Sequence, residues 1–179
     1  MSKGWPHTGE GAWRVWASRY RKGAVVNASV SAFWTLLYVL PFDPFPTLLK
    51  IVVAGGPGVW FMLGYLLYMI VGFGGFLGLS YLYSTSEDSG GRRVNDALAL
   101  TGYAALFIGF TGTTVGLAVA GAVGGYTAVI LHAPAENVRM VMEPFVNPLR
   151  ILCLIAVMGA IASLVAAYAP KPSHPSTTT

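Results

Sequence analysis

Residues 97–131 read ALALTGYAALFIGFTGTTVGLAVAGAVGGYTAVIL, a run of 35 residues without a charged side chain. A helix needs about 20 predominantly apolar residues to cross the roughly 30 Å hydrocarbon core of a bilayer. The run contains no proline and no polar turn, so the sequence predicts one long helix here rather than two short spans. A segment of this kind is typical of an integral membrane protein.

The composition of the whole chain favours the same class. Of 179 residues, 55% are hydrophobic and 10% are charged, whereas an ordinary soluble domain carries about 25% charged residues. Intrinsic disorder and an intrachain disulfide framework are excluded, because hydrophobicity is high and Cys153 is the single cysteine. The 11 basic residues lie between apolar runs and form no basic stripe, so the net charge of +4 does not indicate a nucleic-acid partner.

Three further runs are long and apolar enough to cross a bilayer. Pro41 follows the first run, Pro57 marks the start of the second, and Pro170 follows the last. We therefore predict an all-α membrane protein with one transmembrane domain over residues 23–169. It consists of four antiparallel transmembrane helices at approximately residues 23–40, 57–83, 97–131 and 151–169.

The basic residues predict the orientation. With four spans both termini lie on one side, and that side carries eight Lys and Arg residues against three on the other. The positive-inside rule then places both termini in the cytoplasm, in a multi-pass protein of the cell membrane. The eight are Lys3, Arg14, Arg19, Arg21, Lys22, Arg92, Arg93 and Lys171, and the three are Lys50, Arg139 and Arg150.

Three segments outside the spans carry expectations of their own. Residues 1–22 mix aromatic and basic side chains, which indicates a cytoplasmic segment at the membrane surface or, alternatively, a docking segment for a partner. Residues 170–179 predict a disordered cytoplasmic tail. Residues 133–148 predict an external loop that lies flat on the membrane or contacts a partner. The candidate partner contacts are Trp13, Trp16, Arg139, Glu143 and Arg150.

Small residues recur at intervals of three or four along the second and third predicted spans. Lipid tails are as apolar as leucine, so membrane helices associate through the close packing that small residues permit. The alternative is that the glycines make room for a flat cofactor. The candidate helix-packing residues are Gly64, Gly72, Gly75, Gly109, Gly112, Gly116, Gly121 and Gly125.

The predicted spans contain no Asp, Glu, Lys, Arg or His, which disfavours carriers and pumps. A polar pore would have to use the hydroxyls near Ser31 and Thr113, and a quinone-using membrane enzyme would depend on His132 at a helix end. No acid–base pair, nucleophile–base arrangement or metal-ligand cluster is visible in the sequence. We therefore predict no catalytic, cofactor-binding or metal-binding residue.

The stretches Gly121–Gly125, Ala135–Arg139 and Glu143–Arg150, followed by a helix with Gly159, resemble the last helices of the catalytic subunit of haem–copper oxidases. The similarity is to the cbb3-type oxidase and nitric oxide reductase branch and covers about residues 57–165. In that family a helix ends in glycines, an amphipathic loop follows, and a Pro-x-Arg-like segment starts the next helix. The family binds haem and copper through intramembrane histidines, which this sequence lacks, so no ligand position carries over.

The resemblance thus implies a ligand-free relative packed beside a redox subunit. We expect a non-catalytic accessory subunit of a larger membrane complex, a respiratory terminal oxidase of the electron-transport chain. Haem and copper are then expected in partner subunits, and this chain alone binds no cofactor. Its expected partners are other integral membrane subunits and lipid. The alternative is a small homo-oligomeric transporter or channel.

Overall fold

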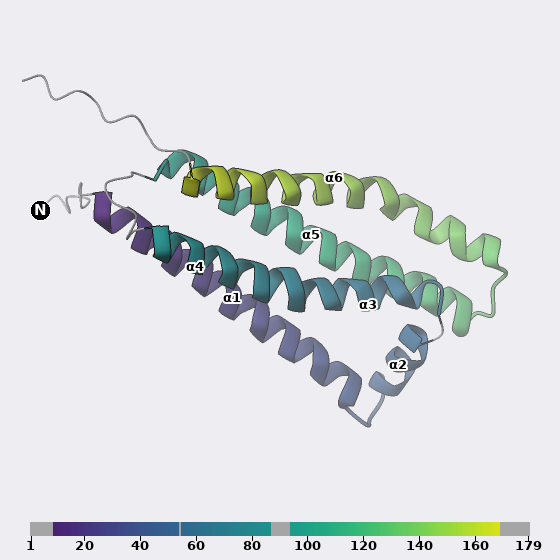
Figure 1. The fold of residues 1–179 in the computed structure, drawn as a ribbon. Coiled ribbons are helices and arrows are strands. Elements are labelled where there is room, and N and C mark those ends of the chain that lie inside the picture. The colour runs from purple at the N-terminus through teal and green to yellow at the C-terminus, as the bar shows by residue number, and fades with distance from the viewer. Residues whose placement is uncertain (1–8, 54, 87–93, 169–179) are drawn as a thin grey trace, which may run out of the picture.

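The computed structural model describes residues 9–53, 55–86 and 94–168, and all regular structure in these ranges is helical (Figure 1). The predicted all-α fold class is therefore confirmed. In chain order the helices are α1 (Gly9–Val39), α2 (Phe45–Val53), α3 (Gly58–Leu67), the π-helix η1 (Tyr68–Gly75), α4 (Phe76–Ser86), α5 (Asp96–Val129) and α6 (Ala135–Tyr168).

Within the described ranges, three helical stretches are long and apolar enough to cross a membrane, namely Gly58–Ser86, Asp96–Val129 and Ala135–Tyr168. The first is formed by α3, η1 and α4, which follow one another without a break. The predicted span at 23–40 forms the second half of α1, which is not among the three. Four basic residues in the first half of α1, with Asn27 and several hydroxyls in the second, lower its apolar character.

The long helical stretches, here called rods, are α1, the continuous run α3–η1–α4, α5 and α6, and they extend between two ends of the molecule (Figure 1). The beginnings of α1 and α5 and the ends of α4 and α6 lie at one end of the molecule, here named the Trp16 end. The beginnings of α3 and α6, the end of α5 and the short helix α2 lie at the other, here named the Trp60 end. α1 diverges from the other rods toward the Trp60 end, and α2 occupies the space between α1 and the start of α3.

Two helix boundaries differ from the predicted ones. α1 begins at Gly9, so much of the segment expected at the membrane surface continues the first helix. α6 begins at Ala135, so the expected external loop forms about four additional helical turns before the apolar part. Pro144 and Pro148 lie inside α6, and each removes one backbone hydrogen bond. The carbonyls this frees belong to the exposed residues Met140 and Pro144, where water can satisfy them.

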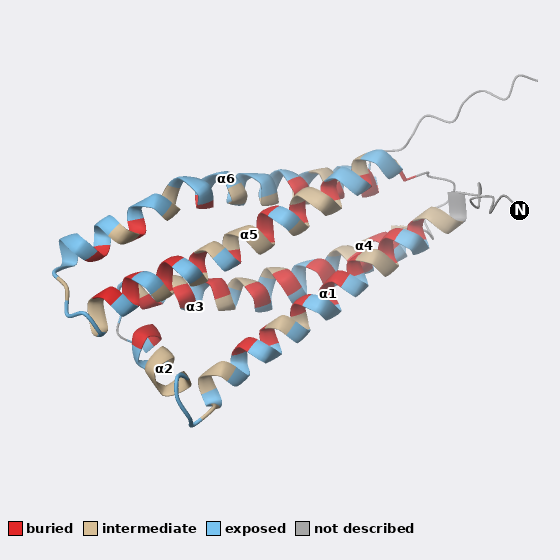
Figure 2. Cartoon of the chain, turned by 180° about the vertical axis from the view of Figure 1, so that it is seen from behind, coloured by how far each residue is buried: buried red, intermediate tan, exposed pale blue. Residues whose placement is uncertain are grey.

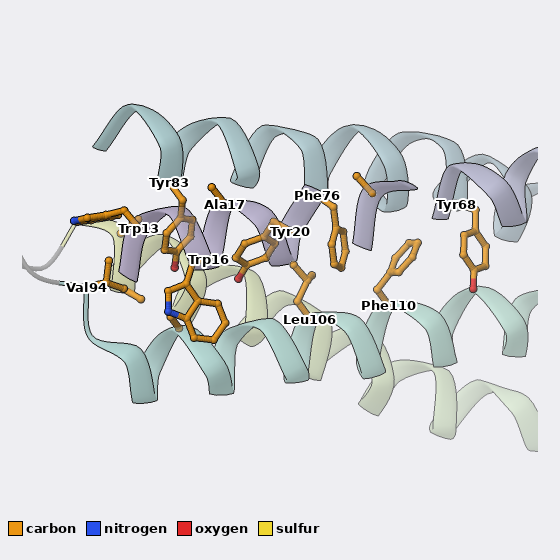
Figure 3. Close-up of a cluster of buried hydrophobic side chains, with 14 of the residues drawn as sticks. Trp13, Trp16, Ala17, Tyr20, Tyr68, Phe76, Tyr83, Val94, Leu106 and Phe110 are labelled. Atoms are coloured by element: carbon orange, nitrogen blue, oxygen red, sulfur yellow. The ribbon is translucent and has the colours of Figure 1, made fainter. Parts of the chain in front are cut away.

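Aromatic side chains fill the interior at the Trp16 end (Figure 3). Tyr20 from α1 stacks on Tyr83 from α4 with 5.3 Å between ring centroids, and Phe76 lies 5.9 Å from Tyr20. Trp13 and Trp16 lie on the same face of α1, because residues three or four apart share one side of a helix. This aromatic face explains why the helix begins so early: its burial stabilises the first turns of α1 against the rest of the bundle.

Candidate functional site

Glycines on one face of α5 bring its backbone into contact with α6. A Cβ added at Gly109 would meet the backbone carbonyl of Leu152 at 2.7 Å, and one at Gly112 would lie 2.8 Å from the Leu152 side chain. At Gly116 the obstacle is the side chain of Leu149, also at 2.8 Å. Real Cβ atoms essentially never approach this closely. At Gly109 the obstacle is backbone, so a side chain there would push the two helices apart, whereas at Gly112 and Gly116 a leucine side chain would have to move.

Glycines on other faces of α5 and on α3 make equivalent contacts. A Cβ at Gly121 would collide with the backbone of Phe61 on α3, and one at Gly64 would lie 2.7 Å from the carbonyl oxygen of Thr114 on α5. Gly125 packs against α2, where a Cβ would collide with the side chain of Ile51 and lie 3.1 Å from its carbonyl oxygen. The structure therefore distributes the predicted glycines over several interfaces.

The two remaining candidates lie in η1. A Cβ added at Gly72 would lie 2.7 Å from the ring of Phe110, whereas one at Gly75 would meet only Val71 of its own helix, at the ordinary distance of 3.7 Å. The prediction missed several contacts of the same kind, among them that of Gly102 with Ser163 and that of Gly159 of α6 with α5. Gly102 stands seven residues, or about two turns, before Gly109, and that spacing could have revealed it.

The indoles of Trp13 and Trp16, expected at the membrane surface or against a partner, lie in the core of this chain, each 3% exposed. The Trp16 Nε1 atom donates a 2.8 Å hydrogen bond to Oδ1 of Asp96 at the start of α5. The Arg19 guanidinium lies 4.4 Å from the centre of the Trp16 ring, a distance at which a cation and a ring attract. The hydrogen bond joins the beginnings of α1 and α5, whereas the Arg19–Trp16 contact lies within α1.

Three hydroxyls that a pore could use, those of Ser31, Thr113 and Thr114, are engaged by backbone carbonyls, whereas the buried Thr111 hydroxyl has no hydrogen-bond partner among the described residues. Ser31 donates to the carbonyl of Asn27 at 2.9 Å, and Thr113 donates to that of Gly109 at 2.7 Å. Thr114 bonds to the carbonyls of Phe110 and Thr111 of its own helix. Hydroxyls bonded back to their own helix serve its structure and present little polar surface to a solute.

A buried amide supports the π-helix. Asn27 of α1 is 1% exposed, and its Nδ2 atom donates a 2.9 Å hydrogen bond to the carbonyl oxygen of Gly72 in η1. A π-helix forms wider i→i+5 bonds and leaves individual carbonyls to find other partners. The side chain from α1 thus supplies a hydrogen bond to a backbone carbonyl of η1 in an apolar interior.

A groove with a volume of about 870 Å³ opens at the Trp60 end, between the start of α3, the end of α5 and the first half of α6. The candidate contact residues Arg139, Glu143 and Arg150 line it together with Asn147, and all four are exposed. Their spacing of four, four and three residues places them along one side of α6. The structure therefore gathers these predicted residues on a helix, where a loop was expected.

The remaining candidates lie apart from this groove lining. His132 is exposed in the turn between α5 and α6 with a φ of 50°, a conformation that reverses the chain after α5. Cys153 is exposed on α6. Among the described residues, no three His, Cys, Asp or Glu side chains come close enough to hold a metal ion.

No known protein family, curated protein or solved structure matches this chain.

Proposed function

We propose that this chain is a non-catalytic integral membrane subunit of a larger complex, and that it associates with partner subunits through the outer face of α6. In this proposal four antiparallel helices, with α1 as the first, cross the cell membrane and both termini lie in the cytoplasm. The distribution of basic residues supports that orientation, since the cytoplasmic side would hold eight of the 11.

The observation that carries the proposal is a seam of apolar side chains on α6, facing away from α5. Each of its members is between 44% and 62% exposed. The members follow one another at alternating intervals of three and four residues, the spacing of knobs-into-holes packing between two helices. The seam consists of Ile151, Leu154, Met158, Ile161, Val165 and Tyr168. Figure 2 shows that α6 is exposed along most of its length.

The packing of the interior favours a structural role over transport. The hydroxyls of Ser31, Thr113 and Thr114 are bonded to helix backbones, and the glycine contacts bring α5 against both α3 and α6. A channel built from several copies of this chain would therefore have to place its pore between copies. The resemblance in sequence to haem–copper oxidases makes a respiratory terminal oxidase the proposed complex, with haem and copper held by the partner subunits.

The test is purification of the chain, tagged at its C-terminus, from native membranes in a mild detergent. We expect larger membrane subunits to co-purify and the visible spectrum to show haem bands. Met158→Trp, which enlarges the centre of the seam, should lower the yield of these partners severalfold. Met69→Trp is the matched control, because Met69 is exposed on η1 and lies outside the seam. A colourless preparation containing only this chain would overturn the proposal.

A further inference from the structure

We propose that the groove at the Trp60 end binds an anionic phospholipid. Its phosphate would contact the arginines of α6, and the part of an acyl chain nearest the headgroup would lie against the apolar side of the groove. This inference goes beyond the proposed function, since it concerns a site within the isolated chain. It rests on three features of the groove: the division of its lining into polar and apolar sides, the charges on the polar side, and its position along α6.

The lining is divided in the way an amphiphile requires. Apolar side chains from two elements form one wall, with Pro57 and Trp60 from the start of α3 and Val138 and Met142 from α6. Val138 and Met142 are buried, and Trp60 is partly buried. An indole of this kind is common at the level of lipid headgroups, where one side of the ring meets apolar chains and the N–H meets water.

The polar side carries a net positive charge. Arg139 and Arg150 contribute two guanidinium groups against the one carboxylate of Glu143. In the described part of the chain, neither guanidinium has an ion-pair or hydrogen-bond partner. Guanidinium groups bind phosphate oxygens through two parallel charge-assisted hydrogen bonds, so unpartnered arginines at a membrane surface are complementary to a lipid phosphate.

The position of Arg150 along α6 agrees with the depth at which lipid phosphates lie in a bilayer. After Arg150, α6 continues from Ile151 to Tyr168 without a charged residue. These 18 residues extend about 27 Å at 1.5 Å per residue, close to the thickness of the hydrocarbon core. Arg150 therefore lies where the core meets the headgroups. Helical side chains lean toward the N-terminus of their helix, so the Arg150 guanidinium extends toward Arg139 and the polar side of the groove.

The experiment measures lipid binding to the purified, delipidated full-length chain by native mass spectrometry. The probes are dioleoylphosphatidylglycerol, which is anionic, and dioleoylphosphatidylcholine, which has the same acyl chains and no net charge. We expect the anionic lipid to bind about tenfold more tightly. Arg139→Gln and Arg150→Gln should each remove most of that difference. Lys50→Gln is the matched control, because Lys50 is an exposed cation of α2 that does not line the groove.

A second variant keeps the test decisive if the arginine variants do not fold. Glu143→Gln removes the one carboxylate among the described residues that line the groove and should strengthen binding of the anionic lipid. Equal binding of the two lipids, or an equal loss in Lys50→Gln and Arg150→Gln, would overturn the proposal. Displacement of the lipid by millimolar inorganic phosphate would also overturn it, because the site would then recognise a free anion without its acyl chains.

Discussion

The hydroxyl of Tyr20 on α1 donates a 2.6 Å hydrogen bond to the hydroxyl of Ser163 on α6, although 143 positions separate the two residues. Ser163 donates in turn to the carbonyl oxygen of Gly159 at 2.7 Å, and its own carbonyl oxygen accepts a 2.8 Å hydrogen bond from Tyr83 of α4. Three helices are thus connected by a short polar network inside an otherwise apolar core. Hydrogen bonds in such surroundings are not weakened by competing water.

Tyr20→Phe should lower the free energy of unfolding by about 1 kcal/mol, the usual net contribution of one hydrogen bond. The ring, and with it the packing on Phe76 and Tyr83, is retained in this variant. The measurement is unfolding of the purified protein in mixed micelles, followed by tryptophan fluorescence. Tyr81→Phe is the control, because Tyr81 is exposed on α4 and its change should leave stability unaltered. Equal stability of the Tyr20 variant and the natural protein would contradict the structural role of the network.

Gly109→Ala should destabilise the protein by about 1–3 kcal/mol, the usual cost of overpacking a close contact. The added methyl group would meet the backbone of Leu152 and Ala156, which cannot rotate away as a side chain can. Gly78→Ala provides the matched control, since no atom lies within 4 Å of a Cβ at that position. There the change should be neutral or stabilising by up to about 1 kcal/mol, because alanine restricts the unfolded chain. Thermal unfolding of both variants in detergent distinguishes the two cases.

The glycine contacts could be located from the sequence because their cause is local: a small residue every three or four positions leaves one face of a helix open. The sequence could not show which helix covers each face. Gly109 and Gly121 belong to one helix, yet the first contacts α6 and the second contacts α3. That assignment depends on where three helices lie relative to one another, which no spacing within α5 encodes.

The two misplaced boundaries have a related cause. Arg14, Arg19, Pro144 and Pro148 are residues that normally mark a membrane surface or the end of a helix. In the structure, the aromatic face of α1 outweighs its charged residues: Arg14 is exposed, and Arg19 lies over the ring of Trp16. The buried side chains of Val138 and Met142 likewise hold the first half of α6 on the bundle despite its prolines. Tertiary packing decided both cases.

Asn27→Ala should open the π-helix locally. The substitution removes the Asn27 donor to the Gly72 carbonyl in the core, and loss of a buried hydrogen-bond partner costs about 1–3 kcal/mol. We expect faster hydrogen–deuterium exchange of the amides of η1, with little change in those of the distant half of α6. Ser29→Ala is the control, because the Ser29 hydroxyl is exposed and bonds only to the carbonyl of Val25 in its own helix. Unchanged exchange in η1 would show that the amide does not support this segment.

The single cysteine makes the proposed membrane topology directly measurable. Cys153→Ser gives a chain without thiols, and new cysteines can then be introduced one at a time at exposed positions. If α1 is the first of four spans, Arg21 and Thr85 lie on the cytoplasmic side, whereas Lys50 and Glu136 lie on the outer side. The positive-inside rule and the alternation of the helix ends both lead to this arrangement.

Intact cells are treated with a membrane-impermeant maleimide before and after permeabilisation. We expect Lys50→Cys and Glu136→Cys to react in intact cells, and Arg21→Cys and Thr85→Cys to react only after permeabilisation. The pair Arg21 and Lys50 is the decisive one. Arg21 lies in α1 and Lys50 in α2, so the predicted first span is the one span between them. Labelling of both from the same side would mean that α1 lies outside the membrane and that three helices span it.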